Sequence, residues 1–256
     1  MLSAKFSPII RRIIANPQIL KVKCPEMEKR LQSQGKADSE GTGNKVTNHE
    51  AAFATVLEDH GFTWLPKNKK NDHLRDLPTE GFYYIYQANG SQAAVDFEVF
   101  RVAESQIKES YKIDCKHSTS EIAMLNDGWF DKDTLYVMTW TAKKIVKGLI
   151  AFGSTFTTKE DDEMYKETRR IISDLNSQPK KGANFSRYFR CANQFHLKTF
   201  TDDFIQNCTE ATFEIMGPAA KPKRFQFKLA ASPVVAPAPP PSPAEPHSPL
   251  EQSAPS

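Results

Sequence analysis

Alternating apolar and polar side chains mark several β-strands along the chain. Side chains on a strand point to opposite faces with a period of two. In the segment 93–103, Val95 and Phe97 therefore share one face, whereas Asp96 and Glu98 share the other. The same reasoning predicts further strands at 82–87, 110–116, 134–141 and, as a fifth, 145–152.

Helical spacing of apolar residues predicts three helices, which span 8–20, 48–60 and 159–175. The second helix carries the clearest start signal, because Thr47 and Glu50 have the spacing of a capping box. Gly61 follows and favours termination there. Thr157 and Thr158 are the candidate N-caps of the third helix. Together these elements predict an α/β fold with a central mixed β-sheet flanked by helices.

Composition divides the chain into three segments. The last one, 231–256, is rich in proline and holds little that could form a core, which predicts a disordered or polyproline tail. The first, 1–46, combines an N-terminal helix with a polar, glycine-containing linker at 32–45. The remaining segment, 47–230, is predicted to be the single main domain, since 256 residues with 39% hydrophobic side chains can bury one substantial core.

Cysteine usage and charge exclude some classes of protein. Four cysteines occur without any Cys-x-x-Cys pair, which argues against a zinc knuckle and against a disulfide framework. No apolar run is long enough to cross a membrane, so we expect a soluble, intracellular protein without a membrane partner. The net charge of +3 is too small to indicate nucleic-acid binding, for which the location of the charge matters more.

Candidate chemistry lies on two of the predicted strands. In 110–116, Lys112, Asp114 and Lys116 share the polar face, which converges with that of Asp96 if the two strands are neighbours. Two carboxylates at close range repel each other unless a cation lies between them, and hard oxygen ligands of this kind suit Mg²⁺. Lys116 would then lie beside a metal-bound water and offset charge on a phosphate. This arrangement predicts a magnesium-dependent nuclease.

The order of these motifs resembles type II restriction endonucleases of the PD-(D/E)XK nuclease superfamily over roughly residues 48–190. The matching segments are Gly90-Ser91-Gln92, Asp96-Phe97, Asp114-x-Lys116 followed by Ser118, Met124-Leu125-Asn126-Asp127 and Thr134-Leu135-Tyr136-Val137-Met138. Val95 stands where the family usually has proline, which leaves Glu98 as an alternative first acid. Asp114 replaces the commoner glutamate, a variation that the family tolerates.

The resemblance implies a restriction-endonuclease-like fold and Mg²⁺-dependent cleavage of double-stranded DNA at a short palindromic sequence, leaving 5′-phosphate and 3′-hydroxyl ends. It implies a metal site made by Asp96, Asp114, Cys115 and Glu50, with Lys116 activating water. A homodimer and a cognate DNA methyltransferase are the implied protein partners. The chain also looks similar to endonucleases encoded by large viruses of green algae, which would place it in the host cell or the virion.

Basic stretches at 67–75, 180–190 and 221–228 contain donors that suit contacts with DNA. The candidate DNA-binding residues are Lys69, Lys70, Lys181, Asn184, Arg187, Tyr188 and Arg190. The alternative for each stretch is a solvated surface, because charge runs are common. The middle stretch is favoured, since it resembles the aromatic and arginine-bearing segment that follows the catalytic core in related nucleases.

Several alternatives stay open. Glu50 needs no metal role if it only completes the capping box with Thr47. Cys115 would be an ordinary buried cysteine, because alternation turns it away from the face of Asp114. The acids and Lys116 could form an ordinary ion pair on an exposed strand face. The two other functional classes are a structure-selective DNA repair or recombination nuclease and a non-catalytic DNA-binding virion protein.

Overall fold

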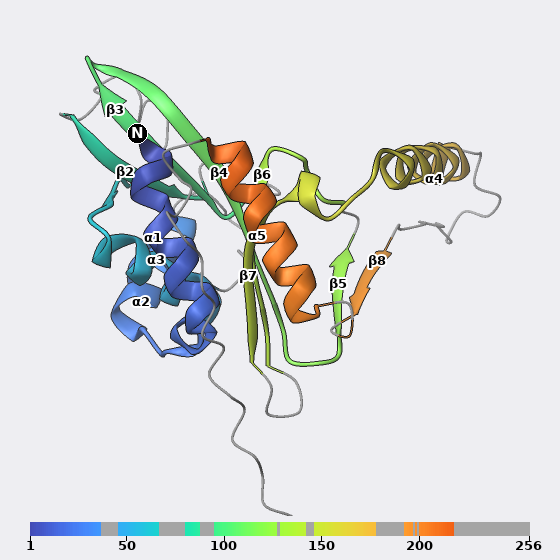
Figure 1. Ribbon diagram of the computed structural model, residues 1–256, viewed down its shortest axis with the longest axis horizontal. Coiled ribbons are helices and arrows are strands. Elements are labelled where there is room, and N and C mark those ends of the chain that lie inside the picture. Colours follow the sequence, from blue (N-terminus) through green and yellow to red (C-terminus); the bar gives the residue numbers. More distant parts are fainter. Residues whose placement is uncertain are drawn as a thin grey trace, which may run out of the picture. The chain divides into compact units, whose positions relative to one another are not determined.

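The computed structural model describes residues 1–36, 46–66, 80–87, 95–126, 129–141, 146–177, 192–196, 198 and 200–217. Within them, a mixed six-stranded sheet combines with five α-helices, which confirms the predicted α/β class (Figure 1). The predicted proline-rich tail at 231–256 lies outside these residues. None of the described helices is long and apolar enough to span a membrane.

The sheet has the strand order β1-β2-β3-β4-β6-β7. Its strands are β1 Thr63–Trp64, β2 Gly81–Tyr86, β3 Phe97–Ala103, β4 Gln106–Ser118, β6 Thr134–Trp140 and β7 Lys147–Phe152. Strands β2, β3 and β4 pair antiparallel, whereas β4 and β6 run parallel, so the sheet is mixed. Two further strands, β5 Ile122–Asn126 and β8 Ala192–His196, form a separate antiparallel pair.

The helices are α1 Leu2–Ala15, α2 Pro25–Lys36, α3 Asn48–Asp59, α4 Lys159–Ser177 and α5 Asp202–Met216. The helix predicted at 8–20 is confirmed in type but not in its bounds, because α1 spans Leu2–Ala15 and a 3₁₀ turn follows at Pro17–Lys21. A proline restricts the residue before it to extended conformations, and Asn16 has φ −143° and ψ 77°. The linker predicted at 32–45 is also corrected, since α2 reaches Lys36.

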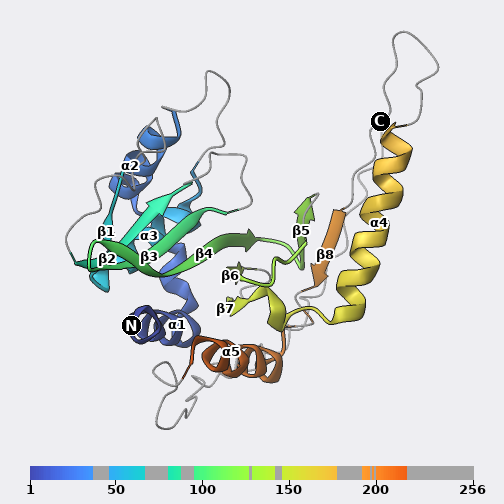
Figure 2. The ribbon, with the colours of Figure 1, turned by 90° about the horizontal axis from the view of Figure 1, so that it is seen from above.

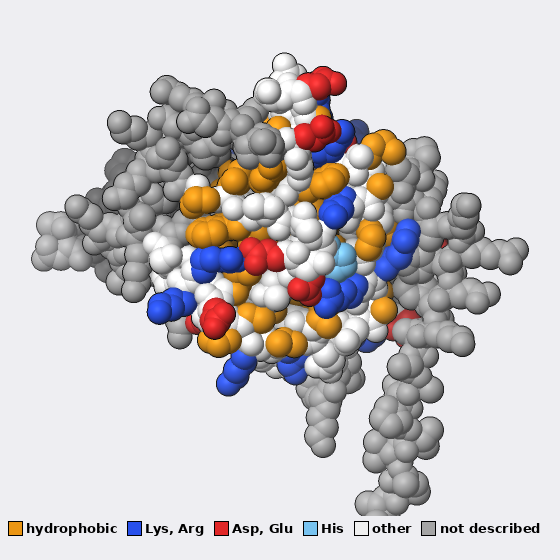
Figure 3. Space-filling view, turned by 90° about the vertical axis from the view of Figure 1, so that its left-hand side faces the viewer, with side chains coloured by type: hydrophobic (Ala, Val, Ile, Leu, Met, Phe, Trp, Pro, Cys, Tyr) orange, Lys and Arg blue, Asp and Glu red, His pale blue; other side chains and the backbone are white. Residues whose placement is uncertain are grey.

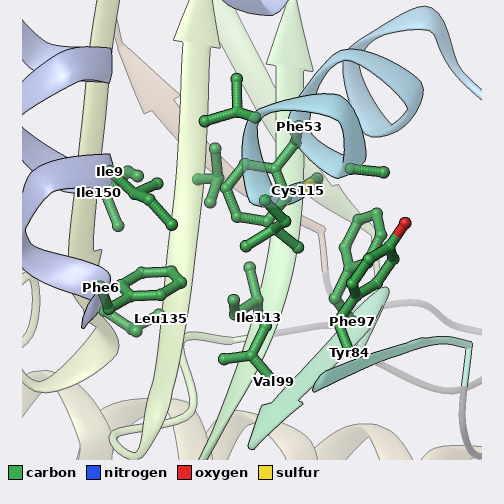
Figure 4. Close-up of a cluster of buried hydrophobic side chains, with 14 of the residues drawn as sticks. Phe6, Ile9, Phe53, Tyr84, Phe97, Val99, Ile113, Cys115, Leu135 and Ile150 are labelled. Carbon is green, nitrogen blue, oxygen red and sulfur yellow. The ribbon is translucent and has the colours of Figure 1, made fainter. Parts of the chain in front are cut away.

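The main hydrophobic core lies between the sheet and the helices α1 and α3 (Figure 4). Helix α1 contributes Phe6 and Ile9, and α3 contributes Phe53, all fully buried. From the sheet, the inward residues of each strand pack against them, including Phe97, Val99, Ile113, Cys115, Leu135 and Ile150. Figure 2 shows α3 beside the strands β1 to β4, with α2 next to it.

Strand β6 is buried on both faces, because a second core covers its other side. Leu135 and Val137 belong to the main core, whereas Tyr136 and Met138 pack with residues of α5 such as Ile205. A strand covered on both faces carries apolar residues at every position and loses the period of two. The parallel pairing places Asp114 and Lys116 of β4 beside Tyr136 and Met138 of β6 in register.

The capping box predicted at the start of α3 is confirmed. The Thr47 hydroxyl accepts a hydrogen bond from the Glu50 N–H at 3.2 Å, and the Thr47 N–H donates to Glu50 Oε2 at 3.3 Å. We expect Thr47→Ala to lower the free energy of unfolding by about 1 kcal/mol in urea denaturation, since it leaves an N–H of the first turn unpaired. Thr47→Ser keeps the hydroxyl and should retain most of the stability. Equal losses in both variants would contradict the capping role.

Candidate metal and catalytic centre

The candidate centre forms where β3 begins later than predicted. Among the described residues no strand pairs with β4 beyond Ile113 on the β3 side, which is called the open side of β4 here. The Asp96 N–H donates to the carbonyl of Ile113 at 2.9 Å, and Phe97 pairs with the same Ile113 in register. Asp96 therefore lies just before the first residue of β3 but stays hydrogen-bonded to β4. The Asp96 carboxylate turns to β4 and accepts the N–H of Cys115 at 2.8 Å.

Asp114 and Lys116 lie on β4 at this open side and share one face, as their spacing predicts. Lys116 Nζ lies 2.6 Å from Asp114 Oδ1. The Asp114 side chain is only 8% exposed, whereas that of Lys116 is 34% exposed. The lysine therefore forms the solvent side of the pair, and the carboxylate forms its buried side.

The carboxyl groups of Asp96 and Asp114 lie close enough for the charge of Asp96 to raise the pKa of Asp114. Burial is the main reason that the pKa of Asp114 rises to about 7, and the nearby Asp96 adds to the rise while Lys116 opposes it. Burial also raises the pKa of Asp96, against the effect of the Cys115 N–H. Two ionised carboxylates at this distance therefore destabilise each other unless a proton or a cation is shared between them.

Lys116 remains an ammonium ion in this setting. Burial acts to lower the pKa of Lys116, but the carboxylates of Asp114 and Asp96 outweigh it, and the net shift is upward. A lysine with a raised pKa is a hydrogen-bond donor and a positive charge at neutral pH rather than a base. It is therefore suited to orient a water molecule and to offset negative charge.

Glu50, in the first turn of α3, lies near Asp96. Its Oε2 accepts hydrogen bonds from the Tyr86 hydroxyl at 2.7 Å and from the Thr47 N–H. Burial raises the pKa of Glu50, and the charge of Asp96 raises it further. The Glu50 carboxylate can therefore complete the capping box and also lie near Asp96.

The Cys115 thiol is within reach of the charges of the acids but is buried and neutral. The side chain lies in the hydrophobic core beside Phe53 (Figure 4), and burial raises the pKa of the thiol well above its ordinary value. Metals bind the thiolate, so this neutral thiol is unsuited as a ligand. The N–H and C=O of one strand residue point to the same side. The Cys115 main-chain carbonyl therefore faces the open side of β4, where its N–H meets Asp96.

Glu98, the alternative first acid, lies further from the centre. It pairs in register with Lys112, one step along β3 and β4 from the region of Asp114. His117 is on the opposite face from Lys116, where it stacks on His49 with ring centroids 5.7 Å apart. The geometry thus favours Asp96 as the partner of Asp114.

The donor set fits one kind of metal better than others. Among the described residues, no group of three or more His, Cys, Asp or Glu side chains is arranged to hold a metal ion. Mg²⁺ needs only one or two carboxylates, because it keeps several waters and binds substrate phosphates. Asp96 and Asp114, with the carbonyl of Cys115 beside them, match this requirement, and a cation would relieve their mutual repulsion.

The predicted DNA-binding residues lie outside the described part of the chain, namely Lys69, Lys70, Lys181, Asn184, Arg187, Tyr188 and Arg190. On the face shown in Figure 3, acidic and basic side chains of the described residues are interspersed with hydrophobic ones and form no continuous patch of one sign.

Two residues near the centre were missed by sequence reasoning. Gln87 Nε2 donates to the Tyr86 hydroxyl at 2.9 Å, and the Gln87 N–H donates to the Asp96 carbonyl at 2.7 Å. The alternation of Tyr84 and Tyr86 on the predicted strand was the available signal, since it places both hydroxyls on one face.

Comparison of the chain with protein-family models, with curated proteins and with solved structures found no match.

Proposed function

We propose that this protein is a Mg²⁺-dependent endonuclease of double-stranded DNA, of the type II restriction class. The observation that carries the proposal is the meeting of Asp96, Asp114 and Lys116 at the open side of β4. Buried carboxylates with raised pKa values destabilise the folded protein when they are ionised. Clusters of such groups beside a lysine occur preferentially at functional sites. The resemblance of the motif order to PD-(D/E)XK nucleases supplies the reaction class.

Each residue has a separate role in the proposed reaction. Asp96 and Asp114 would hold Mg²⁺, with the Cys115 carbonyl beside them. When bound, Mg²⁺ lowers the pKa of a coordinated water and stabilises charge on the phosphate. Lys116 donates hydrogen bonds to the attacking water or the phosphate.

Phosphodiester hydrolysis balances with water as the only co-reactant. The water oxygen forms a bond to phosphorus, and the bond from phosphorus to the 3′ oxygen breaks. The departing oxygen takes up a proton, which gives 5′-phosphate and 3′-hydroxyl ends. A homodimer would present this site once to each strand of a palindromic sequence, and a cognate methyltransferase would protect the genome that encodes the enzyme.

Cleavage assays with paired acid variants test the proposal. The wild-type protein is expected to cut unmodified duplex DNA into discrete fragments with Mg²⁺, and to leave it intact with a chelator. Asp96→Asn should lower the cleavage rate by about 10²-fold or more, because it removes one of the two negative ligands. Glu98→Gln, two residues further along the chain, should stay within about twofold of wild type.

The choice of substrate separates the alternative classes. Intact duplex together with a nicked four-way junction would contradict the restriction class in favour of a structure-selective nuclease. DNA that is bound with a steep salt dependence but never cut would contradict any nuclease role. A larger loss in Glu98→Gln than in Asp96→Asn would contradict the assignment of the first acid.

A further inference from the structure

Helix α4, the longest helix of the described residues (Figure 2), exposes a row of apolar side chains. Met164, Ile171 and Leu175 are 63%, 47% and 39% exposed. Together with Thr168 they occupy positions i, i+4, i+7 and i+11, which lie on one face of a helix. These four residues are called the α4 stripe here. A contiguous exposed apolar surface indicates an interaction site, whereas scattered apolar side chains do not.

The contacts that anchor α4 lie in its first two turns. Asp162 is the only buried residue of the helix, and its carboxylate accepts the Trp129 indole N–H at 2.9 Å and pairs with Lys132 Nζ at 2.6 Å. Tyr165 stacks on Trp129 with ring centroids 5.1 Å apart. Helices in proteins gain most of their stability from packing of an amphipathic face. The α4 stripe is therefore the face through which a partner would stabilise the later turns.

The spacing of the α4 stripe reads the same in both directions along the helix. The steps between its residues are four, three and four, which is the spacing of the contact positions in coiled coils. In an antiparallel pair, Met164 lies opposite Leu175 of the second copy, and Thr168 lies opposite Ile171. The same four residues of both copies then form an isologous two-fold interface. The stripe is thus complementary to itself.

The charges along α4 favour the antiparallel direction. Residues 160–163 are all acidic, whereas the sequence 169–181 holds four cations and a single acid, Asp174. An antiparallel pair places the acidic part of each copy beside the basic part of the other. It also places each helix N-terminus near the C-terminus of the other helix, where the helix dipoles attract each other. A parallel pair would bring like charges together.

We propose that α4 is a dimerisation helix, whose stripe packs antiparallel against the same stripe of a second copy of this chain. The surface follows from α4 alone. The use of the pair rests on the function proposed above, because two copies present one site to each strand of duplex DNA.

Sedimentation equilibrium of the whole chain over a range of concentrations tests the surface. Wild-type protein is expected to dimerise, and Ile171→Glu should raise the dissociation constant on the order of 100-fold or more. The interface contains the substituted residue twice, and each copy would bury a charge among apolar side chains. Val22→Glu is the matched control, because Val22 is 56% exposed and lies outside α4. It should leave the dissociation constant within about twofold.

Disulfide crosslinking tests the direction of the pair. The single variants Met164→Cys and Leu175→Cys are mixed and oxidised, with a size tag on one of them. A crosslink is expected between the two variants but not between identical copies. Positions 164 and 175 lie about 16 Å apart along a helix, and a disulfide needs Cα atoms within about 7 Å. Oxidised wild-type protein gives the background from the native cysteines.

The outcomes separate this interface from the nuclease proposal. A wild-type chain that stays monomeric, equal losses in Ile171→Glu and Val22→Glu, or crosslinks between identical copies alone would overturn the antiparallel α4 pair. A monomeric chain that cuts duplex DNA with Mg²⁺ would overturn the pair and leave the nuclease proposal intact. A dimer that depends on Ile171 but cuts no DNA would support the interface and contradict the nuclease.

Discussion

Replacement of Lys116 by methionine is expected to lower the rate of Mg²⁺-dependent DNA cleavage on the order of 10³-fold, the size of effect seen when one preorganised donor to a developing negative charge is removed. Methionine fills a similar volume but offers no positive charge and no N–H. The raised pKa of Lys116 means that the wild-type side chain is charged throughout the neutral range. Single-turnover cleavage of duplex DNA measures the effect on the chemical step.

Lys112→Met is the matched control for this experiment. Lys112 lies on the same strand and on the same face as Lys116, but it pairs with Glu98 rather than approaching Asp114. Its replacement should leave the single-turnover rate within about twofold, since it is an exposed surface position. Equal losses in the two variants would mean that general basicity of this face, and not a catalytic ammonium group, is responsible.

Replacement of Asp114 by asparagine is expected to stabilise the metal-free protein while it abolishes cleavage. The pKa of Asp114 rises from 3.8 to about 7, mainly through burial. Such a rise corresponds to at most about 4 kcal/mol of destabilisation once the carboxyl is ionised. Asparagine avoids the charge but does not reproduce every hydrogen bond, so we expect the free energy of unfolding to rise by about 1–2 kcal/mol at pH 8.

The stabilisation by Asp114→Asn should depend on pH in a defined direction. A carboxyl whose pKa is raised in the folded state binds a proton there that the unfolded state has lost, so stability falls as pH rises through this range. For Asp114 the window runs from about pH 4 to about pH 7, and the wild-type protein loses this stability across it. The variant should therefore be no more stable than wild type near pH 4, where only its lost hydrogen bonds count, and should gain stability relative to wild type up to about pH 7.

Urea denaturation in a chelating buffer at pH 5 and pH 8 measures this difference. Glu98→Gln serves as the control, and its stability should stay within about 0.5 kcal/mol of wild type at both values. An Asp114→Asn variant that is less stable than wild type at pH 8 would indicate a structural ion pair with Lys116. Loss of one partner from such a buried pair is destabilising, the opposite of the expected result.

The start of α3 could be predicted from the sequence because its signals are local. Thr47 and Glu50 lie three positions apart on the chain, and both halves of their capping box form. Helix α2 was missed although Pro25 and Glu26 are good first-turn residues, because the glycine-containing stretch that follows favoured a linker. Two local signals therefore conflict in this segment, because Pro25 and Glu26 favour a helix whereas the glycine favours a linker.

The strand ends around the centre could not be predicted, because they depend on contacts between distant segments. Strand β3 begins at Phe97, and beyond it the Cys115 N–H binds the side chain of Asp96 instead of a main-chain carbonyl. Strand β4 begins at Gln106, because Glu104 and Ser105 form its hairpin with φ values of 53° and 57°. Turns of that kind normally carry glycine or asparagine, so this sequence gives little warning of one.

The candidate centre was predicted in part. Alternation alone placed Asp114 and Lys116 on one face, and the structure brings Asp96 to them. The contacts of Tyr86 and Gln87 depend on how β2 packs against α3, which no local pattern encodes. The raised pKa values of Asp96 and Asp114 could not be predicted from a local pattern either, because burial is the largest cause of both.

The most direct test is whether Asp96 and Asp114 hold one divalent ion between them. Calorimetric titration of Mn²⁺ into the metal-free wild-type protein at pH 8 should show binding, and Asp96→Asn and Asp114→Asn should each weaken it at least about tenfold. Wild-type protein that binds no Mn²⁺, or Asn variants that bind it as tightly as wild type, would contradict a shared metal site and with it the proposed nuclease.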